Sequence, residues 1–262
     1  MASLCQPAGL AVDGTGNLYV ADAGNCRVLI FNDPFATDLT ADAALGQASG
    51  VCTGATTADR LYAPMGVAVD SAGNAFVADT LHCRVLEYDT PLTSDTLPDR
   101  VFGQTSYTTQ ACSGANNLYF PQTVAVDHDE RLYVGTPAVV AVYDAVLTSD
   151  QTIDRQIGTR QCNDGGEGAA TTCGPIGVTT DAGGHLYVAD AGNSRVLEFD
   201  TPATVSQAAR VFGQPLFSGT ADLFHDACNS GGPSASSLCL RTVQLLTLGG
   251  TYTEAAALAV DG

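Results

Sequence analysis

Apolar and polar positions alternate in short runs, and the whole pattern returns along the chain. Residues 10–31 read LAVDGTGNLYVADAGNCRVLIF, and the same order of runs and turns returns at 67–88, 124–143 and 178–199. A fifth copy begins at Leu258. A fixed period indicates a repeat architecture before any single residue does. One Asp closes the first run of each copy, and the intervals between these residues are 57, 57, 54 and 80 positions: Asp13, Asp70, Asp127, Asp181 and Asp261.

Each repeat contains four runs that predict short β-strands. The connection between the first and second strands (the 1–2 turn) reads DGTGN, DSAGN or DAGGH, and Asp or Asn followed by Gly is typical of a hairpin. The connection between the third and fourth strands (the 3–4 loop) begins with Asp-Pro or Asp-Thr-Pro, and the Pro ends the strand because it has no N–H to donate. A four-stranded antiparallel meander is therefore predicted, with strands over 9–13, 17–22, 27–31 and 43–47; over 66–70, 74–79, 84–89 and 100–104; and over 177–181, 185–190, 195–200 and 210–214.

The second strand of the first repeat carries apolar side chains on both sides. Leu18 and Val20 alternate with Tyr19 and Ala21. Both faces of the sheet must then be covered, which happens when successive repeats pack face to face as blades. The pattern predicts an all-β chain built as a β-propeller of four-stranded antiparallel blades.

The residues that carry this pattern resemble a known family. The order P-x-G-V-A-V-D-x-x-G-N-L-Y-V-A-D-x-x-x-x-R-V-L is similar to the NHL repeat, strongly in the first, second and fourth units and weakly in the third, where 134–137 read VGTP. The resemblance implies β-propellers that commonly have six blades, and it implies little about function. The units are placed at about residues 5–61, 62–118, 119–173 and 174–240, within one propeller region over 1–262.

Four units and one further strand are fewer than six blades. We therefore expect a piece of a longer propeller, whose remaining blades would be partners of this chain, and name an unusually small propeller as the alternative. Residues 241–262 hold an insertion, Arg241 to Ala256, followed by the start of the fifth unit. The insertion is interpreted as a surface extension or as a functional loop.

The repeat register sorts the nine cysteines. In a propeller the connection between the second and third strands (the 2–3 loop) lies on the same side as the connection from the fourth strand to the next blade (the 4–1 connection), and we call this side the top. The first two units have one cysteine in each of these places, and the next two have a pair in the 4–1 connection. The predicted disulfides are Cys26–Cys52, Cys83–Cys112, Cys162–Cys173 and Cys228–Cys239, with Cys5 unpaired and its partner expected upstream.

Composition and net charge limit the classes of ligand and the cellular locations that the chain could have. The net charge of -18 disfavours nucleic-acid binding and is typical of an acidic secreted protein. The sequence contains no run of about 18 apolar residues, so no membrane span is predicted. No Cys-x-x-Cys or Cys/His cluster has zinc spacing, so the cysteines favour disulfides and a secreted, periplasmic or cell-surface location.

Repeated carboxylates are the first candidates for chemistry. Asp22, Asp79 and Asp190 each stand five positions before an Arg. Repetition favours a structural interpretation, in which each Asp caps the 2–3 loop and pairs with that Arg. Calcium at some of the carboxylates remains an alternative, although no D-x-D-x-D-G loop is present.

Histidines and serines predict no catalytic set. The register places His82 and His225 on the top and His128 and His185 at the 1–2 turns. The residues that begin each first strand, as in Pro64-Met65-Gly66, offer no acid, base or metal ligand, and no Gly-x-Ser-x-Gly occurs. No catalytic residue, resident metal or cofactor is therefore predicted.

Two functions remain. The favoured one is a non-catalytic extracellular binding or scaffold module for a protein or carbohydrate ligand. The alternative is a propeller lyase or hydrolase whose axial metal site is incomplete in this chain. A module of the first kind would bind through its top loops, and their candidate residues are Asp22, Asn25, Asp79, His82, Asp190, Asn193 and His225.

Overall fold

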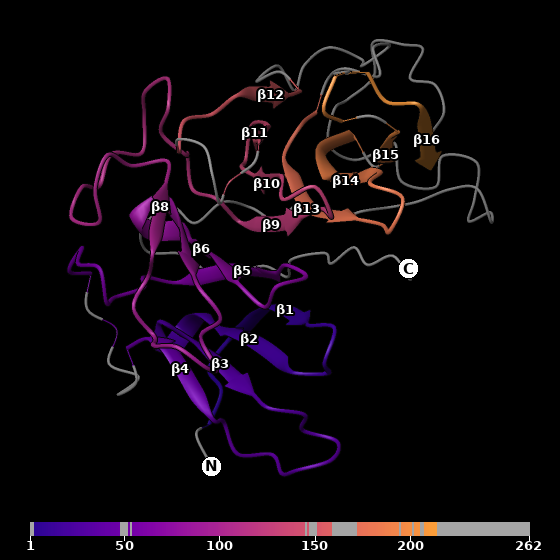
Figure 1. Cartoon of the computed structure of the whole chain (residues 1–262). Helices are drawn as coiled ribbons and strands as arrows, with labels where there is room; N and C mark the ends of the chain where they lie inside the picture. Colours follow the sequence, from indigo (N-terminus) through magenta and orange to yellow (C-terminus); the bar gives the residue numbers. More distant parts are fainter. Residues whose placement is uncertain are drawn as a thin grey trace. The chain divides into compact units, whose positions relative to one another are not determined.

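The computed structural model contains four antiparallel sheets of four strands each (Figure 1). It describes residues 3–47, 52, 54–144, 146, 151–158, 172–193, 195–200, 202–204 and 207–213. Helical structure in this part is limited to short 3-10 turns. None of the helices described there has the length and apolar character needed to cross a membrane. The predicted fifth unit, over 241–262, lies outside the described residues.

Each sheet is one repeat, with strands adjacent in the order in which they follow along the chain. We number these sheets blades 1 to 4. The prediction of an all-β chain built from four-stranded antiparallel blades is confirmed. Blade 1 is β1 (Pro7–Val12), β2 (Leu18–Asp22), β3 (Arg27–Phe31) and β4 (Ala43–Gly46); blade 2 is β5 (Pro64–Val69), β6 (Ala75–Asp79), β7 (Arg84–Tyr88) and β8 (Arg100–Phe102); blade 3 is β9 (Thr123–Val126), β10 (Leu132–Gly135), β11 (Val140–Tyr143) and β12 (Arg155–Ile157); blade 4 is β13 (Pro175–Thr180), β14 (Leu186–Asp190), β15 (Arg195–Phe199) and β16 (Arg210–Gly213).

The first strands begin two residues earlier than the sequence predicts in blades 1, 2 and 4. In blade 2, Pro64 already pairs with Asp79, and the register then shifts before Gly66. A proline is tolerated as the first residue of a strand, and the irregularity that follows has the character of a β-bulge. The sequence pattern marked the regular part of the strand and missed this bulged beginning.

A side-chain aspartate organises every 1–2 turn. In blade 1, one oxygen of Asp13 accepts the backbone N–H groups of Thr15 and Asn17, and the other accepts the Asn17 amide at 2.7 Å. The hydrogen bonds hold Asp13 ionised, and its pKa is lowered although burial acts in the opposite direction. Such Asx-type contacts explain why the Asp recurs at each turn. Asp70, Asp127 and Asp181 make the equivalent contacts in the other blades.

The chain divides into two compact units, and we describe each by itself. The first holds blades 1 and 2 and most of blade 3; the second holds blade 4 and short segments of blade 3. Within the first unit, β6 supplies both packing layers. Ala75 and Val77 face the cluster shared with blade 1, while Phe76 and Ala78 face the cluster shared with blade 3. Both faces of blade 2 are therefore buried, as the alternation of apolar residues predicted.

Glycine lets the first strands of adjacent blades approach at backbone distance. A Cβ on Gly66 of β5 would lie 2.9 Å from the carbonyl oxygen of Gln122, beside β9. A Cβ on Gly9 of β1 would lie 2.5 Å from the carbonyl oxygen of Met65. No side chain fits at these distances, so the Gly of the P-x-G sequence is required by packing between blades 1, 2 and 3.

Candidate functional site

The 2–3 loops that the sequence selected are one-turn 3-10 helices. They are η1 (Ala23–Asn25), η2 (Thr80–His82) and η3 (Ala191–Asn193). In blades 1 and 2 the cysteine that follows adopts a left-handed conformation, with φ of 55° at Cys26 and 57° at Cys83. That conformation turns the chain back into the third strand and aims the sulfur toward the 4–1 connection.

A buried ion pair closes each of these loops. Asp79 Oδ2 accepts a hydrogen bond from Arg84 Nε at 2.7 Å, and both side chains are fully buried. Asp22 and Arg27 form the same pair at 2.8 Å in blade 1. In blade 4, Arg195 Nε lies 2.8 Å from Asp190 Oδ2. We call this unit the Asp–Arg latch, and it is the pairing that the repeat predicted.

The second oxygen of each latch aspartate holds the start of the first strand. Asp22 Oδ1 accepts the backbone N–H of Cys5 at 2.6 Å, and Asp79 Oδ1 accepts that of Tyr62 at 2.6 Å. Asp190 Oδ1 accepts the N–H of Cys173 at 2.6 Å. Both oxygens of all three carboxylates are therefore used within the blade, which argues for a structural role and leaves little for a ligand.

Arg84 is the most embedded member of the latches. Besides Asp79, its guanidinium donates to the carbonyl oxygens of Thr57, Arg60 and Tyr107. These carbonyls belong to the connections before and after blade 2, so one buried cation gathers both of them around the 2–3 loop. Arginine suits this position because its five N–H donors satisfy several acceptors in one plane.

Disulfides join the same segments covalently. Cys26 is bonded to Cys52 and Cys83 to Cys112, each with a Cα–Cα separation of 5.2 Å. These are the two predicted pairs of blades 1 and 2. Cys5 is free and exposed, and the partner expected for it upstream stays a prediction.

The remaining predicted pairs involve residues outside the described part of the chain. Cys173 is disulfide-bonded, and its predicted partner Cys162 lies outside the described residues. Cys228 and Cys239 also lie outside them, and so does His225 of the proposed top loops. These assignments stay predictions.

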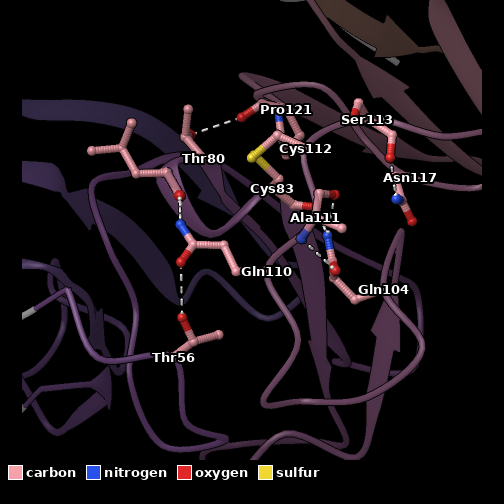
Figure 2. The surroundings of a disulfide bond; sticks show 11 residues. Thr56, Thr80, Cys83, Gln104, Gln110, Ala111, Cys112, Ser113, Asn117 and Pro121 are labelled. Carbon is pink, nitrogen blue, oxygen red and sulfur yellow. Dashed lines mark hydrogen bonds between the residues drawn. A yellow bond between two sulfur atoms is a disulfide. The ribbon is translucent and has the colours of Figure 1, made fainter. Parts of the chain in front are cut away.

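The Cys83–Cys112 bond is surrounded by hydrogen bonds that extend across two blades (Figure 2). The Gln110 side chain donates to the Leu81 carbonyl at 2.8 Å and accepts from the Thr56 hydroxyl at 3.2 Å. Thr80 Oγ1 donates to the Pro121 carbonyl at 2.7 Å, where blade 3 begins. The top of the first unit is therefore one connected set of loops, which we call the stapled platform (54–63, 80–83 and 105–121).

His82 occupies the place that Asn25 and Asn193 hold in blades 1 and 4. The two asparagines donate their amides to their latch aspartates at 2.8 Å. His82 contacts Asp79 through Nδ1 at 2.9 Å, and its buried Nε2 has no hydrogen-bond partner. An Asp–His pair resembles part of a catalytic triad, but no nucleophile of the described residues reaches Nε2. The binding role predicted for these residues remains a prediction.

The other described histidines lie at the opposite ends of the second strands. His185 contacts Asp181 at 2.8 Å in the 1–2 turn of blade 4, and this carboxylate raises the pKa of the imidazole. His128 lies in the 1–2 turn of blade 3, 3.4 Å from Asp129. Within the first unit, His128 is separated from the 2–3 loops by the length of a strand, so it does not share a metal site with His82.

One acidic group escaped the sequence analysis. Glu87, Asp89 and Asp99 of blade 2 present one oxygen each within 4.8 Å of one another, and among the described residues they are the one group with metal-ligand spacing. Burial raises the pKa of Glu87 to about 8, and the neighbouring Asp89 adds to the shift. Arg100 contacts both Glu87 and Asp89. The sequence feature that could have predicted this acidic group is an inward-facing Glu in β7 opposite an Arg in β8.

The comparisons with known proteins agree with the repeat and the fold. A family model described as "NHL repeat" matches residues 4–31 and 172–199, which include the first three strands of blades 1 and 4. The search of curated proteins found no match.

Solved structures with similar folds are distant in sequence. Hydrazine synthase of Kuenenia stuttgartiensis is 14% identical with a TM-score of 0.53, over 80% of this chain and 49% of that chain. A chain of a mitotic checkpoint complex is 13% identical with a TM-score of 0.50, over 78% and 48%. A streptogramin B lyase is 12% identical with a TM-score of 0.48, over 79% and 54%. The chain thus spans about half the length of these structures, and the likeness to the first two concerns the fold alone.

Proposed function

Since the chain carries NHL repeats on propeller blades, we propose that it is a non-catalytic extracellular binding or scaffold module for a protein or carbohydrate ligand. The observation that carries the proposal is the stapled platform. Its loops differ in sequence between repeats, and the Asp79–Arg84 latch and the Cys83–Cys112 disulfide tie them together. Preorganised loops on a rigid scaffold bind with a smaller loss of conformational entropy than mobile loops do.

The platform carries polar and aromatic groups suited to such ligands. Tyr119 is 41% exposed and packs edge-on against Phe120. Exposed tyrosines contribute a flat apolar surface and a hydroxyl, a combination frequent in protein and carbohydrate contacts. Thr56 and Gln110 contribute hydroxyl and amide groups elsewhere on the same connected loops.

Disulfides support the extracellular part of the proposal. Two bonds within the described residues join loops that would otherwise depend on ion pairs and hydrogen bonds alone. Structural disulfides persist in oxidising compartments and are rare in the cytosol. In such compartments the ligands we propose are secreted proteins or surface glycans, and the charge of -18 disfavours a nucleic acid.

The test is a glycan array combined with an array of extracellular protein domains, probed with the oxidised chain. We expect a reproducible ligand whose binding falls at least about tenfold in Tyr119→Ser. Leu97→Ser is the matched control, because Leu97 is also exposed, at 54%, but lies in the 3–4 loop of blade 2. Equal loss in both variants, or a stoichiometric tightly bound zinc in the purified chain, would refute the proposal and favour the lyase or hydrolase alternative.

A further inference from the structure

We propose that Glu87, Asp89 and Asp99 form a binding site for a divalent cation of the calcium type at the base of the 3–4 loop of blade 2. The site lies at the end of β7 away from the 2–3 loop, and it is independent of the stapled platform. Its chemistry is that of hard oxygen ligands, which calcium prefers.

The first argument is geometric. Arg100 donates to one oxygen of Glu87 at 2.8 Å and to one oxygen of Asp89 at 3.2 Å. Asp99 accepts the backbone N–H of Asp89 at 2.8 Å through one of its oxygens. These contacts use one oxygen of each carboxyl group, and the Glu87 and Asp89 carboxyl groups also lie within hydrogen-bonding distance of each other. One oxygen of each lies within 4.8 Å of the others, a spacing from which they can share one ion.

The second argument is a buried oxygen without a hydrogen-bond donor. Glu87 is fully buried, and no N–H or O–H group of the described residues donates to its Oε1; the Asp89 carboxyl group beside it is itself an acceptor when ionised. A buried polar atom in this condition is destabilising unless a ligand satisfies it. Asp89 is 48% exposed, so water has access from one side to complete the six to eight oxygen ligands that calcium takes.

Charge supplies the third argument. Three carboxylates and the Arg100 guanidinium sum to a charge of about -2 when all are ionised, and one divalent cation neutralises that charge. The rest of the chain is strongly acidic, which raises the local concentration of cations.

The other repeats show that this arrangement is particular to blade 2. Blade 3 has Asp144, Asp154 and Arg155 in the matching places, but Val142 replaces the glutamate. Blade 4 has Glu198, paired across the strands with Arg210, but Ala209 stands where blade 2 has Asp99. Blade 1 has Ile30 and Asn32 for the first two carboxylates.

A bound ion would fasten the 3–4 loop of blade 2. Asp89 begins this loop and Asp99 ends it, and the Asp99 N–H already donates to the Glu87 carbonyl at 2.8 Å. Calcium would therefore hold the two ends of the loop against β7. We expect slower hydrogen exchange of the loop amides between these residues when calcium is present.

The experiment is calcium titration of the chelator-treated, oxidised chain by calorimetry, with Ca²⁺ alone as the probe. It is run at neutral and at alkaline pH, because carboxyl groups ligate a cation when deprotonated and binding releases any bound proton. One site is expected, with a Kd of about 10⁻⁴ to 10⁻³ M, as in extracellular calcium modules. Glu87→Gln and Asp99→Asn should each weaken binding at least about tenfold.

Control variants keep the outcome decisive. Asp154→Asn and Glu198→Gln alter the matching places of blades 3 and 4, and both should bind calcium like the original chain. Asp99 is exposed, so Asp99→Asn should leave the chain folded. This variant therefore tests the site even if Glu87→Gln unfolds the protein. Absence of binding up to about 10 mM Ca²⁺, or binding that survives both blade 2 substitutions, would overturn the proposal; the buried Glu87 would then be satisfied by a proton shared with Asp89.

Discussion

Removing the Asp79 carboxylate should destabilise the first unit more than any other single latch substitution. In Asp79→Ala, Arg84 would remain fully buried without an anionic partner, facing backbone carbonyls and the His82 ring, and the Tyr62 N–H would lose its acceptor. Breaking a buried ion pair from one side costs about 3–5 kcal/mol. Because the free energy of unfolding of a domain is about 5–15 kcal/mol, the expected loss is a large share of it.

The assay is urea denaturation under non-reducing conditions, followed by near-ultraviolet circular dichroism of tyrosine, since the chain has no Trp. A double-mutant cycle with Arg84→Ala isolates the pair, and contacting buried groups should show a coupling of about 0.5–3 kcal/mol. Asp22→Ala is the matched variant, and its smaller expected loss follows from the partial exposure of Arg27, at 9%. A coupling near zero, or equal losses in both blades, would refute the reasoning.

Three further outcomes follow from the described contacts. Gly66→Ala should lower the free energy of unfolding by about 1–3 kcal/mol through overpacking against the blade 3 backbone, measured by the same denaturation; an unchanged midpoint would contradict this close approach. Replacing Cys83 and Cys112 together by Ser should cost about 3–4 kcal/mol, because the bond closes a loop with a sequence separation of 29, and a cost under about 1 kcal/mol would argue against a structural bond. Asp181 raises the pKa of His185, so their pair adds stability that is present below the unfolded pKa of about 6.5 and is lost as pH rises through the folded pKa; in Asp181→Asn an NMR titration should move the His185 pKa back toward 6.5, and an unmoved value would show that this carboxylate is not the cause.

Much of the latch could be predicted without coordinates. The spacing from Asp79 to Arg84 is the same in three repeats, and a pair needed in every blade is recognisable by its repetition. Cysteine pairing followed from the same register, because the 2–3 loop and the 4–1 connection leave a sheet on one side. The second function of the latch, holding the Tyr62 backbone, carries no side-chain pattern and had to be observed.

The acidic group of blade 2 shows the opposite case. Glu87 stands where other repeats have Ile, Val or Glu, so its identity alone does not indicate burial or a partner. Its environment depends on Arg100 of β8, on Asp99 just before that strand, and on the Val85 side of the sheet, which faces blade 3. Burial against the neighbouring blade changes the pKa of this acid, and a repeat pattern does not show how deeply a side chain is buried.

By itself, the sequence determined the repeat, the strand order, the turn aspartates and the disulfide register of blades 1 and 2, because these depend on residues a few positions apart or on a fixed period. Tertiary structure alone decided how closely blades pack at Gly66, which carbonyls surround Arg84 and which acid is buried. Those properties arise between segments distant in the chain, where burial and the geometry of neighbouring strands act on each group.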